Sequence, residues 1–351
     1  MNILILGSGA REHSIAWAVK QNPKCCRLLV APGNAGIADI AEISNTNIEN
    51  CDEVVALAKR EKIDFVIIGP EAPLAAGVSD VLKQNGFLVF GPTQAAANLE
   101  VSKSFMKEIC TSANIPTAKY AKFNELGSAR EYVEEQGAPI VIKADWLAAG
   151  KGVTVAMDLP TAYQALEDIF KSGSQNLETK VVIEEFMEGE EASFFVLCNG
   201  QKLLPIGTAQ DHKRVGDGDT GPNTGGMGAY SPAPVLTGKI QDSVIREIIK
   251  PTLREMERRG APYQGVLYAG LMIKDEKARL VEYNARFGDP ECQPLMMRLG
   301  AQVLDLLIAT SNGDLDECQI SWADDHALCV VMASIGSVSY THLTLPTSDL
   351  V

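Results

Sequence analysis

Short apolar runs and amphipathic segments alternate through the first 90 residues. Each apolar run is rich in Ile, Leu and Val and closes in a turn containing Gly or Pro, which is typical of a buried strand. Between these runs, apolar residues recur at helical spacing, as at Ile15 and Val19. We expect strands at 2–6, 28–30, 65–68 and 88–90, a helix after Gly9, and further helices at 54–62 and 78–84. This βαβα order predicts an α/β domain with a parallel sheet.

The pattern changes near Ser102, where longer strands of antiparallel style replace the βαβα alternation. A helix is expected at 103–111, followed by a break at 114–116. The further expected strands lie at 140–144, 153–156, 181–185, 192–198, 266–273 and 279–284, with helices at 161–170 and 238–259. Pro251 should kink the last helix and Gly260 should end it, and a long Gly-rich loop should span 211–228.

Composition and charge exclude several classes of protein. The 351 residues carry 31 Lys and Arg against 45 Asp and Glu, a formal net charge of −14, which disfavours a nucleic-acid or membrane-surface partner. The apolar run before Gly7 is short and has no basic residues ahead of it, and no segment is long and apolar enough for a bilayer. Eight cysteines without a CxxC spacing predict reduced thiols in a cytoplasmic protein.

The first Gly-rich turn, at 7–12, follows a strand and opens a helix, so its backbone amides could hold an anion. As a dinucleotide-binding turn it is weak. Glu12 replaces the third glycine, and Ala31-Pro32 stands where a ribose-binding acid would follow the second strand. A tight turn without a ligand is the alternative.

Two segments in the middle of the chain carry charges that suit a nucleotide. Lys143 lies on an expected strand and precedes an Ala- and Gly-rich turn that ends at Gly152. This turn suits phosphate oxygens, although a flexible hairpin is the alternative. The acidic stretch at 182–191 suits adenine and ribose, although such a stretch is also typical of a solvated turn.

The strongest chemical signal is Glu282, Asn284 and Arg286. Alternate residues of a strand share a face, so a carboxylate and an amide oxygen form half of a Mg²⁺ site, with a guanidinium beside them for a phosphoryl group or a carboxylate. The polar turn at 288–291 continues this set, which argues against a simple buried Glu–Arg pair.

The loop at 211–228 places two cations, Lys213 and Arg214, before a run of glycines. Basic side chains beside a Gly-rich backbone are typical of a clamp that closes on an anion, whereas a plain linker rarely combines the two.

Taken in order, these segments resemble the ATP-grasp superfamily and, within it, the glycinamide ribonucleotide synthetase family. The resemblance runs from residue 1 to about 334. It rests on the motifs at 7–13, 31–36, 69–74, 211–214, 221–230 and 286–291. It implies a Rossmann-like N-terminal domain followed by an ATP-grasp fold. The implied reaction joins glycine to 5-phosphoribosylamine at the expense of ATP, through glycyl phosphate, in purine biosynthesis. The resemblance also implies Mg²⁺ or Mn²⁺ as cofactor and a cytoplasmic monomer.

The family's functional residues map onto this sequence as follows. ATP would be bound by Lys103, Lys143, Glu184, Glu185, Phe186, Met187, Glu191, Arg214 and Asn223. The metal would be held by Glu282 and Asn284, and the catalytic residues would be Arg286, Lys213 and Asp289. Substrate contacts would come from Gly9, Asn34, Glu71, Asp211 and Glu291.

The resemblance also implies a division of the chain. The N-terminal domain would span 1–102 and the ATP-grasp domain 103–326, with a lid at about 121–189. Residues 327–334 would begin an incomplete C-terminal lobe, and 335–351 resemble none of that lobe and are interpreted as a non-native tail. An incomplete lobe predicts poor solubility and weak or absent activity.

Two positions differ from the broader pattern. Trp146 stands where the family's phosphate loop has Gly, which predicts weakened use of ATP. Gly270 stands where many ATP-grasp proteins have another acidic metal ligand. The synthetase family also lacks that acid, so this position agrees with the narrower resemblance.

Three alternatives remain open from the sequence. The nearest is another ATP-grasp ligase that joins a carboxylate to an amine. The second is an inactive or non-catalytic ATP-binding fragment, and the weakest is an NAD-dependent oxidoreductase. Dependence on phosphoribosylamine, ATP binding without turnover, and nicotinamide binding would distinguish them.

Overall fold

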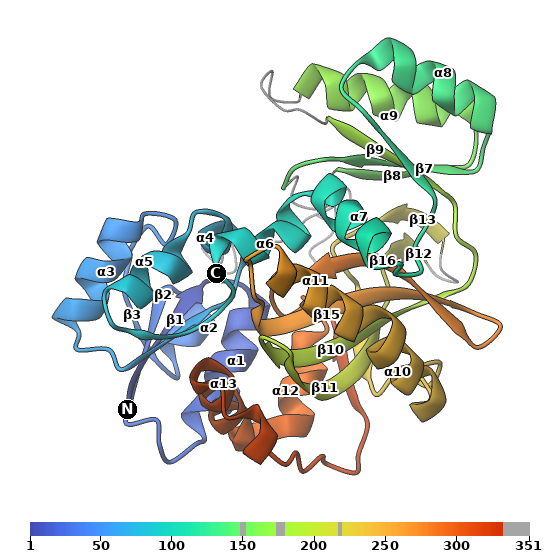
Figure 1. Ribbon diagram of the computed structural model, residues 1–351. Helices are drawn as coiled ribbons and strands as arrows, with labels where there is room; N and C mark the ends of the chain where they lie inside the picture. Colours follow the sequence, from blue (N-terminus) through green and yellow to red (C-terminus); the bar gives the residue numbers. More distant parts are fainter. Residues whose placement is uncertain (148–151, 173–179, 217–219, 333–351) are drawn as a thin grey trace.

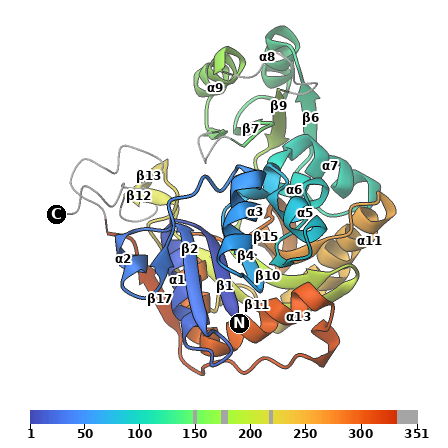
Figure 2. The same cartoon turned by 90° about the vertical axis from the view of Figure 1, so that its left-hand side faces the viewer.

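The computed structural model describes residues 1–147, 152–172, 180–216 and 220–332 (Figure 1). The expected tail at 335–351 and most of the turn after Trp146 lie outside these ranges. The described residues form an N-terminal α/β unit, a large antiparallel sheet with its helices, and a smaller unit that stands apart at one end of the molecule in both views (Figures 1 and 2).

The N-terminal unit is built on a five-stranded sheet in the order β3-β2-β1-β4-β5, and every pair in it is parallel, as predicted. Its strands are β1 (Asn2–Gly7), β2 (Arg27–Pro32), β3 (Glu42–Ile43), β4 (Phe65–Ile68) and β5 (Leu88–Phe90). The order reverses around β1, so the turns that follow β1 and β4 lie side by side at the carboxyl edge. This switch point is where open α/β sheets bind ligands.

Helices cover both faces of this sheet because the side chains of β1 alternate between two cores. Leu4 and Leu6 pack in one core, and Ile3 and Ile5 pack in the other. The helices of this unit are α1 (Ala10–Lys20), α2 (Ala35–Ala38), α3 (Cys51–Arg60), α4 (Glu71–Ala75), α5 (Val78–Gln84) and α6 (Gln94–Val101). Both cores continue into the next unit, so the two units are packed on each other.

The large sheet has six strands in the order β16-β15-β10-β11-β14-β17, and its pairs are antiparallel. Its strands are β10 (Glu190–Asn199), β11 (Lys202–Asp211), β14 (Gly228–Ser231), β15 (Gln264–Lys274), β16 (Lys277–Asn284) and β17 (Ala327–Val330). One face packs on α10 (Gly238–Val244) and α11 (Lys250–Arg258), and the other on α12 (Cys292–Leu299) and α13 (Val303–Asn312).

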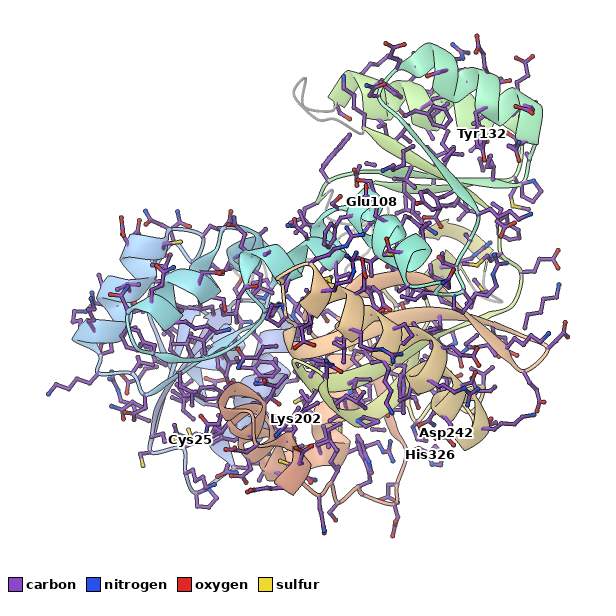
Figure 3. The ribbon with its side chains drawn as sticks, viewed as in Figure 1. Cys25, Glu108, Tyr132, Lys202, Asp242 and His326 are labelled. Carbon is purple, nitrogen blue, oxygen red and sulfur yellow. The ribbon has the colours of Figure 1, made fainter. Side chains whose placement is uncertain are left out.

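The smaller unit, called the lid here, comprises a four-stranded sheet and two helices. The sheet runs β6-β9-β7-β8, with β6 (Tyr120–Phe123), β7 (Ile140–Ala144), β8 (Val153–Ala156) and β9 (Val181–Glu185). The helices α8 (Leu126–Gln136) and α9 (Leu159–Ser172) cover one face and close a separate core. Tyr132 of α8 lies against Phe123 of β6, with ring centres 5.2 Å apart (Figure 3).

Two local expectations need correction, and a third segment can be placed in the fold. The helix expected at 238–259 is divided by a π-helical turn, η1 (Ile245–Ile249), just before Pro251, so the irregularity precedes the proline. The expected loop at 211–228 contains a short hairpin, β12 (Arg214–Gly216) and β13 (Thr220–Asn223). Within the segment 327–334, where a further lobe is expected to begin, the structure has β17, which pairs with β14 at the edge of the large sheet.

The described helices include none with the length and apolar character that crossing a membrane would require.

Candidate active site

Glu282 lies at the centre of the polar cluster that the sequence predicted. It stands near the end of β16, and Asn284 follows on the same face of that strand. Burial alone would raise the pKa of Glu282, but Lys103, Lys213, Lys143 and Arg286 outweigh it and lower the pKa to about 2. The Lys103 Nζ atom lies 3.8 Å from the Glu282 carboxylate. A carboxylate so held is fully ionised at neutral pH, with cations converging on it from several elements.

Lys143, at the end of β7, reaches this centre from the lid. Its Nζ atom lies 3.0 Å from Glu184 of β9 and donates to the Val281 carbonyl at 3.2 Å. That carbonyl belongs to an irregularity of β16, because Gly270 of β15 pairs with Glu282 whereas Leu271 pairs with Leu280. The extra residue of this bulge leaves its carbonyl for Lys143 instead of for the sheet.

The Glu184 carboxylate is shared with a second lysine that the sequence analysis did not single out. Lys107 of α7 (Lys103–Ser112) lies 3.0 Å from Glu184 and is completely buried. Burial lowers the pKa of Lys107, with Glu184 opposing the shift, whereas at Lys143 burial is outweighed by Glu184 and Glu282 and the pKa is raised. Lys107 lies one helical turn beyond Lys103, but this spacing by itself does not indicate a buried pair with Glu184.

Lys213 joins the cluster from the other side. It forms an ion pair with Glu191 of β10 and lies close to Asp211 at the end of β11. Burial would lower the pKa of Lys213, but Glu191, Asp211 and Glu282 raise it well above its usual value. The neighbouring Asp211 is unusual, because burial and the carboxylate of Glu291 raise its pKa to about 7 although Lys213 opposes them.

The raised pKa of Asp211 predicts a pH-dependent affinity for anions. Below about pH 7 Asp211 is neutral, and its ionisation at higher pH adds a negative charge beside Lys213. We therefore expect the dissociation constant for inorganic phosphate to rise about three- to fivefold more between pH 6 and 8.5 in the wild type than in Asp211→Asn. Calorimetric titrations across this range would measure it, and parallel profiles for the two proteins would contradict it.

Arg286 connects the two large units. Its Nε atom lies 3.1 Å from Glu71, at the start of α4, and its second guanidinium nitrogen lies 2.8 Å from Glu100 of α6. Glu100 also accepts a hydrogen bond from the backbone of Ala285 at 2.7 Å. Burial would raise the pKa of Glu71, but Arg286 and Arg11 lower it to about 2. The predicted catalytic arginine is therefore held by the N-terminal unit on both sides.

The remaining predicted substrate residues lie around the turn after β1. Gly9 precedes α1 and donates to Glu12 at 2.8 Å, and Asn34 caps α2 through Ile37 while its amide donates to the Ser8 carbonyl at 2.8 Å. Asp289 faces the same turn, 3.4 Å from the Arg11 backbone nitrogen. The structure thus brings Gly9, Asn34 and Asp289 together from distant parts of the chain.

Glu291 is buried farther inside. Its carboxylate accepts hydrogen bonds from Tyr268 at 2.7 Å and from Ser193 at 3.3 Å. Arg286 and Glu291 are close in the sequence but lie in different surroundings. Arg286 lies where the N-terminal unit meets the large sheet, whereas Glu291 lies close to Asp211.

The residues at 184–187, which were expected to bind ATP, have different surroundings at the end of β9 and just after it. Glu184 points into the cluster, whereas Glu185 forms an ion pair with Arg279 and accepts from the Lys119 backbone, so its side chain is engaged elsewhere. Phe186 is half-buried and Met187 is buried. Arg214 and Asn223 are paired in the hairpin β12–β13, and the side chain of Asn223 lies outside the described part of the structure.

Asp145 is a second residue that the sequence analysis did not single out. Its carboxylate accepts from the Ser104 backbone at 2.8 Å and from the Ser102 hydroxyl at 3.1 Å. These bonds tie the end of β7, which carries Lys143, to the start of α7, which carries Lys103. The two lysines are thereby fixed relative to each other.

The residues present fit a divalent cation. Within the described ranges, no three His, Cys, Asp or Glu side chains are grouped as a metal cage. Mg²⁺ does not need one, because it is usually held by one or two protein oxygens together with phosphate and water. The ionised carboxylate of Glu282 and the amide of Asn284 supply such oxygens, and Gly270 faces Glu282 across the strand pair without adding another acid.

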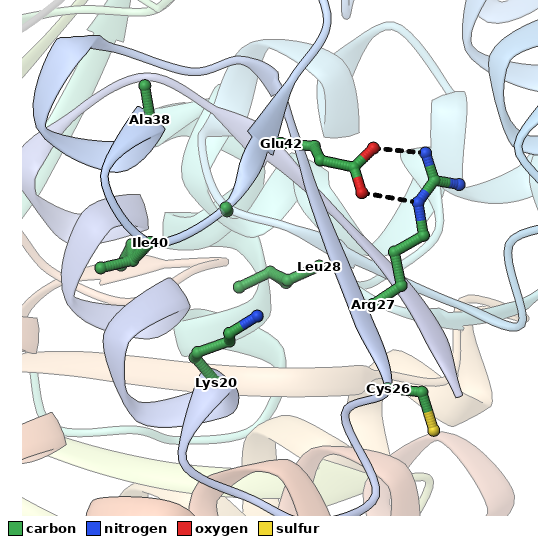
Figure 4. A pocket seen from close by; sticks show the side chains of 8 residues that line it. Lys20, Cys26, Arg27, Leu28, Ala38, Ile40 and Glu42 are labelled. Carbon is green, nitrogen blue, oxygen red and sulfur yellow. Dashed lines mark hydrogen bonds and ion pairs between the residues drawn. The ribbon is translucent and has the colours of Figure 1, made fainter.

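Two surface hollows lie on the described part of the chain, and the residues that line them do not include Glu282 or Lys143. One is lined by Leu28, Ile40 and the paired side chains of Arg27 and Glu42, whose Nε and Oε1 atoms are 2.9 Å apart (Figure 4). The other lies beside the segment that joins α7 to β6. The concentration of charge around Glu282, and not either hollow, identifies the candidate site.

An α/β unit, a large antiparallel sheet and a separate lid that carries Lys143 define an ATP-grasp protein. The solved biotin carboxylase of Campylobacter jejuni, described as a β-γ-ATP complex, has the same fold. It matches 93% of this chain and 74% of its own with a TM-score of 0.69, at 16% identity.

The chain belongs to the phosphoribosylglycinamide synthetase family. The model of the family's N domain matches residues 1–100, and the model of its ATP-grasp (A) domain matches residues 101–292. The phosphoribosylamine–glycine ligase of Mesorhizobium japonicum is 56% identical over 336 residues, which are 96% of this chain and 79% of that protein. The corresponding ligase of Vibrio parahaemolyticus is 51% identical over 340 residues.

A solved relative supports the same assignment. The phosphoribosylamine–glycine ligase of Thermotoga maritima matches 97% of this chain and 83% of its own, with a TM-score of 0.83 and 29% identity. The resemblance inferred from the sequence motifs is therefore confirmed at the level of the family.

Proposed function

We propose that this chain joins glycine to 5-phosphoribosylamine, giving glycinamide ribonucleotide, ADP and phosphate in purine biosynthesis. In this reaction the glycine carboxylate attacks the γ-phosphate of ATP and releases ADP. The ribosylamine nitrogen then attacks the carbonyl of glycyl phosphate, and phosphate leaves. The observation that carries this proposal is the convergence of Lys103, Lys143 and Lys213 on Glu282, in a chain 56% identical to a ligase of that name.

The described residues can perform three tasks in this reaction. Lys103 and Lys143 would bind the phosphates of ATP and offset their charge, because both lie beside Glu282 and come from different units. Arg286, Lys213 and Asp289 would act on glycine and the acyl phosphate, with Asp211 and Glu291 behind them. Glu71, Gly9 and Asn34 would contact phosphoribosylamine at the switch point of the parallel sheet.

Mg²⁺ or Mn²⁺ would be held by Glu282 and Asn284 and would offset charge on the ATP phosphates. The adenosine part of ATP would lie against the backbone of the segment from Glu184 to Met187 and against Glu191, with Arg214 and Asn223 approaching from the hairpin β12–β13. The carboxylate of Glu184 faces Lys107 and Lys143 instead. The support for these roles is that Glu282 and Asn284 lie at the end of β16 in the large sheet, and that residues 184–191 connect β9 of the lid to β10 of that sheet.

We further propose the division of the chain set out from its sequence, with an N-terminal substrate domain at 1–102 and an ATP-grasp domain at 103–326 that includes a lid at about 121–189. Its support is that the parallel sheet ends with β5 and that the lid closes its own core. A cytoplasmic location is proposed because all eight cysteines are free thiols. A monomer stays a prediction.

Omission of single substrates tests the proposed reaction. The purified chain is expected to release ADP and phosphate only when ATP, glycine and phosphoribosylamine are all present, and mass spectrometry should find glycinamide ribonucleotide. Release with another amine in place of phosphoribosylamine would identify a different carboxylate–amine ligase. ATP binding without any release would identify a non-catalytic ATP-binding protein. Either result would overturn the proposal.

Trp146 should limit the use of ATP. It occupies the bend after β7 and packs partly against the lid core, close to Lys143. Because a bulky residue restricts the backbone that a phosphate loop needs to close, Trp146→Gly is expected to lower the KM for ATP or raise kcat by about 2- to 10-fold. Steady-state kinetics would measure this, and unchanged kcat and KM would refute it.

A further inference from the structure

Lys107 is a completely buried lysine to which the proposed reaction assigns no role. Its ammonium group has three N–H donors, and all three have partners: Glu184 at 3.0 Å, the Thr117 hydroxyl at 2.8 Å and the Ala118 carbonyl at 3.2 Å. Its position is therefore fixed from three directions, and it has no remaining donor for a ligand.

The carboxylate of Glu184 is divided between two ammonium groups. One oxygen lies 3.0 Å from Lys107, and the other lies 3.0 Å from Lys143. The three side chains are almost fully buried and together carry a net charge of +1. With Glu184 and Lys143 alone, the pair would be neutral, and the carboxylate would compete directly with any phosphate for Lys143.

The other partners of Lys107 join this group to the base of the lid. Thr117 and Ala118 belong to the segment between α7 and β6, and the Thr117 hydroxyl donates to the Leu280 carbonyl of β16 at 2.7 Å. Lys107 thus links α7 to the segment that leads into the lid and to the lid strand that carries Glu184. A buried charge in this position does not need to stabilise the fold to be useful, since ion pairs of this kind contribute little net stability.

We propose that Lys107 is a positioning residue that holds the Glu184 carboxylate and thereby leaves the positive charge of Lys143 available to the phosphates of ATP. This inference rests on the proposed function, because it requires Lys143 to bind ATP. It predicts a selective effect on phosphate binding, whereas a residue needed only for folding would affect all ligands alike.

The test compares Lys107→Met with Lys122→Met. Lys122, on β6, forms an ion pair with Glu108 at 2.7 Å near the surface and serves as the matched control. In Lys107→Met, calorimetry is expected to find ATP binding weakened about 10-fold, with adenosine binding changed less than about twofold. In kinetics the KM for ATP should rise to the same extent, while kcat and the KM for glycine stay within about twofold.

A milder variant covers the case in which Lys107→Met does not fold. Thr117→Val removes one of the three partners of Lys107 at nearly constant shape, and it should weaken ATP binding about threefold with adenosine unaffected. Unchanged ATP binding, or an equal loss for ATP and adenosine, would overturn the inference.

The wild type separates this inference from the proposed reaction. If it binds ATP but forms no glycinamide ribonucleotide, the reaction is wrong and the comparison of ATP with adenosine still decides the role of Lys107. If it does not bind ATP, both are overturned.

Discussion

Replacement of Glu282 by Gln is expected to lower kcat/KM by at least about 100-fold. Even the alteration of a residue that only contacts a metal ligand lowers metal affinity or activity about 10- to 100-fold. The substitution preserves the shape of the side chain but removes the charge on which Lys103, Lys143, Lys213 and Arg286 converge. Four cations would then lose their shared partner, and the metal would lose its charged protein oxygen. ADP release with all substrates and saturating Mg²⁺ would measure the effect.

Glu276→Gln is the matched control for this prediction. Glu276 lies at the turn between β15 and β16 and forms an exposed ion pair with Lys239. Its substitution should leave activity within about twofold, because exposed pairs contribute little. Activity of Glu282→Gln within threefold of the wild type, with circular dichroism unchanged, would show that Glu282 has no central part in the reaction.

Replacement of Arg286 by Met is expected to affect stability as well as activity. It would leave the buried carboxylate of Glu100 without its cation, and removal of one partner of a buried pair costs about 3–5 kcal/mol of folding free energy. Because Arg286 also pairs with Glu71, contacts between the N-terminal unit and the large sheet would weaken. Denaturant unfolding followed by circular dichroism would measure the loss.

The double variant Arg286→Met with Glu100→Gln tests the cause of that loss. With the buried charge removed as well, we expect about half of the lost stability to return, whereas ligation activity should not return. Arg246→Met, which alters an exposed pair with Glu247, should stay within about 0.5 kcal/mol of the wild type. A double variant as unstable as Arg286→Met would locate the defect elsewhere.

The elements that the sequence predicted best are those whose pattern is local. The runs at 65–68 and 88–90 are strands because a buried parallel strand is apolar on both faces and ends in a turn. Segments with mixed patterns were missed, among them α8, β11, α12 and α13. The hairpin β12–β13 was hidden in a Gly-rich stretch, because its pairing follows from contacts and not from strand-forming residues.

The candidate site shows the same division. Glu282 and Asn284 could be predicted because they lie on one strand at a spacing that fixes their common face, and Arg286 follows in the bend just beyond the end of that strand. Lys107, Asp145 and Glu100 could not, because each acts on a residue that is distant in the sequence. A lysine on a helix is ordinarily exposed, and nothing local indicates that Lys107 is buried against Glu184.

By itself, therefore, the sequence determined the class of fold, the family and the main charged residues, since these depend on local pattern and on ordered motifs. Only the tertiary structure decided how those charges are paired. Glu282 is surrounded by cations, Glu184 is shared by two lysines, and Arg286 is held between Glu71 and Glu100. The physical reason is that pairing and pKa depend on burial and on distances between side chains, and these arise only when separate elements pack together.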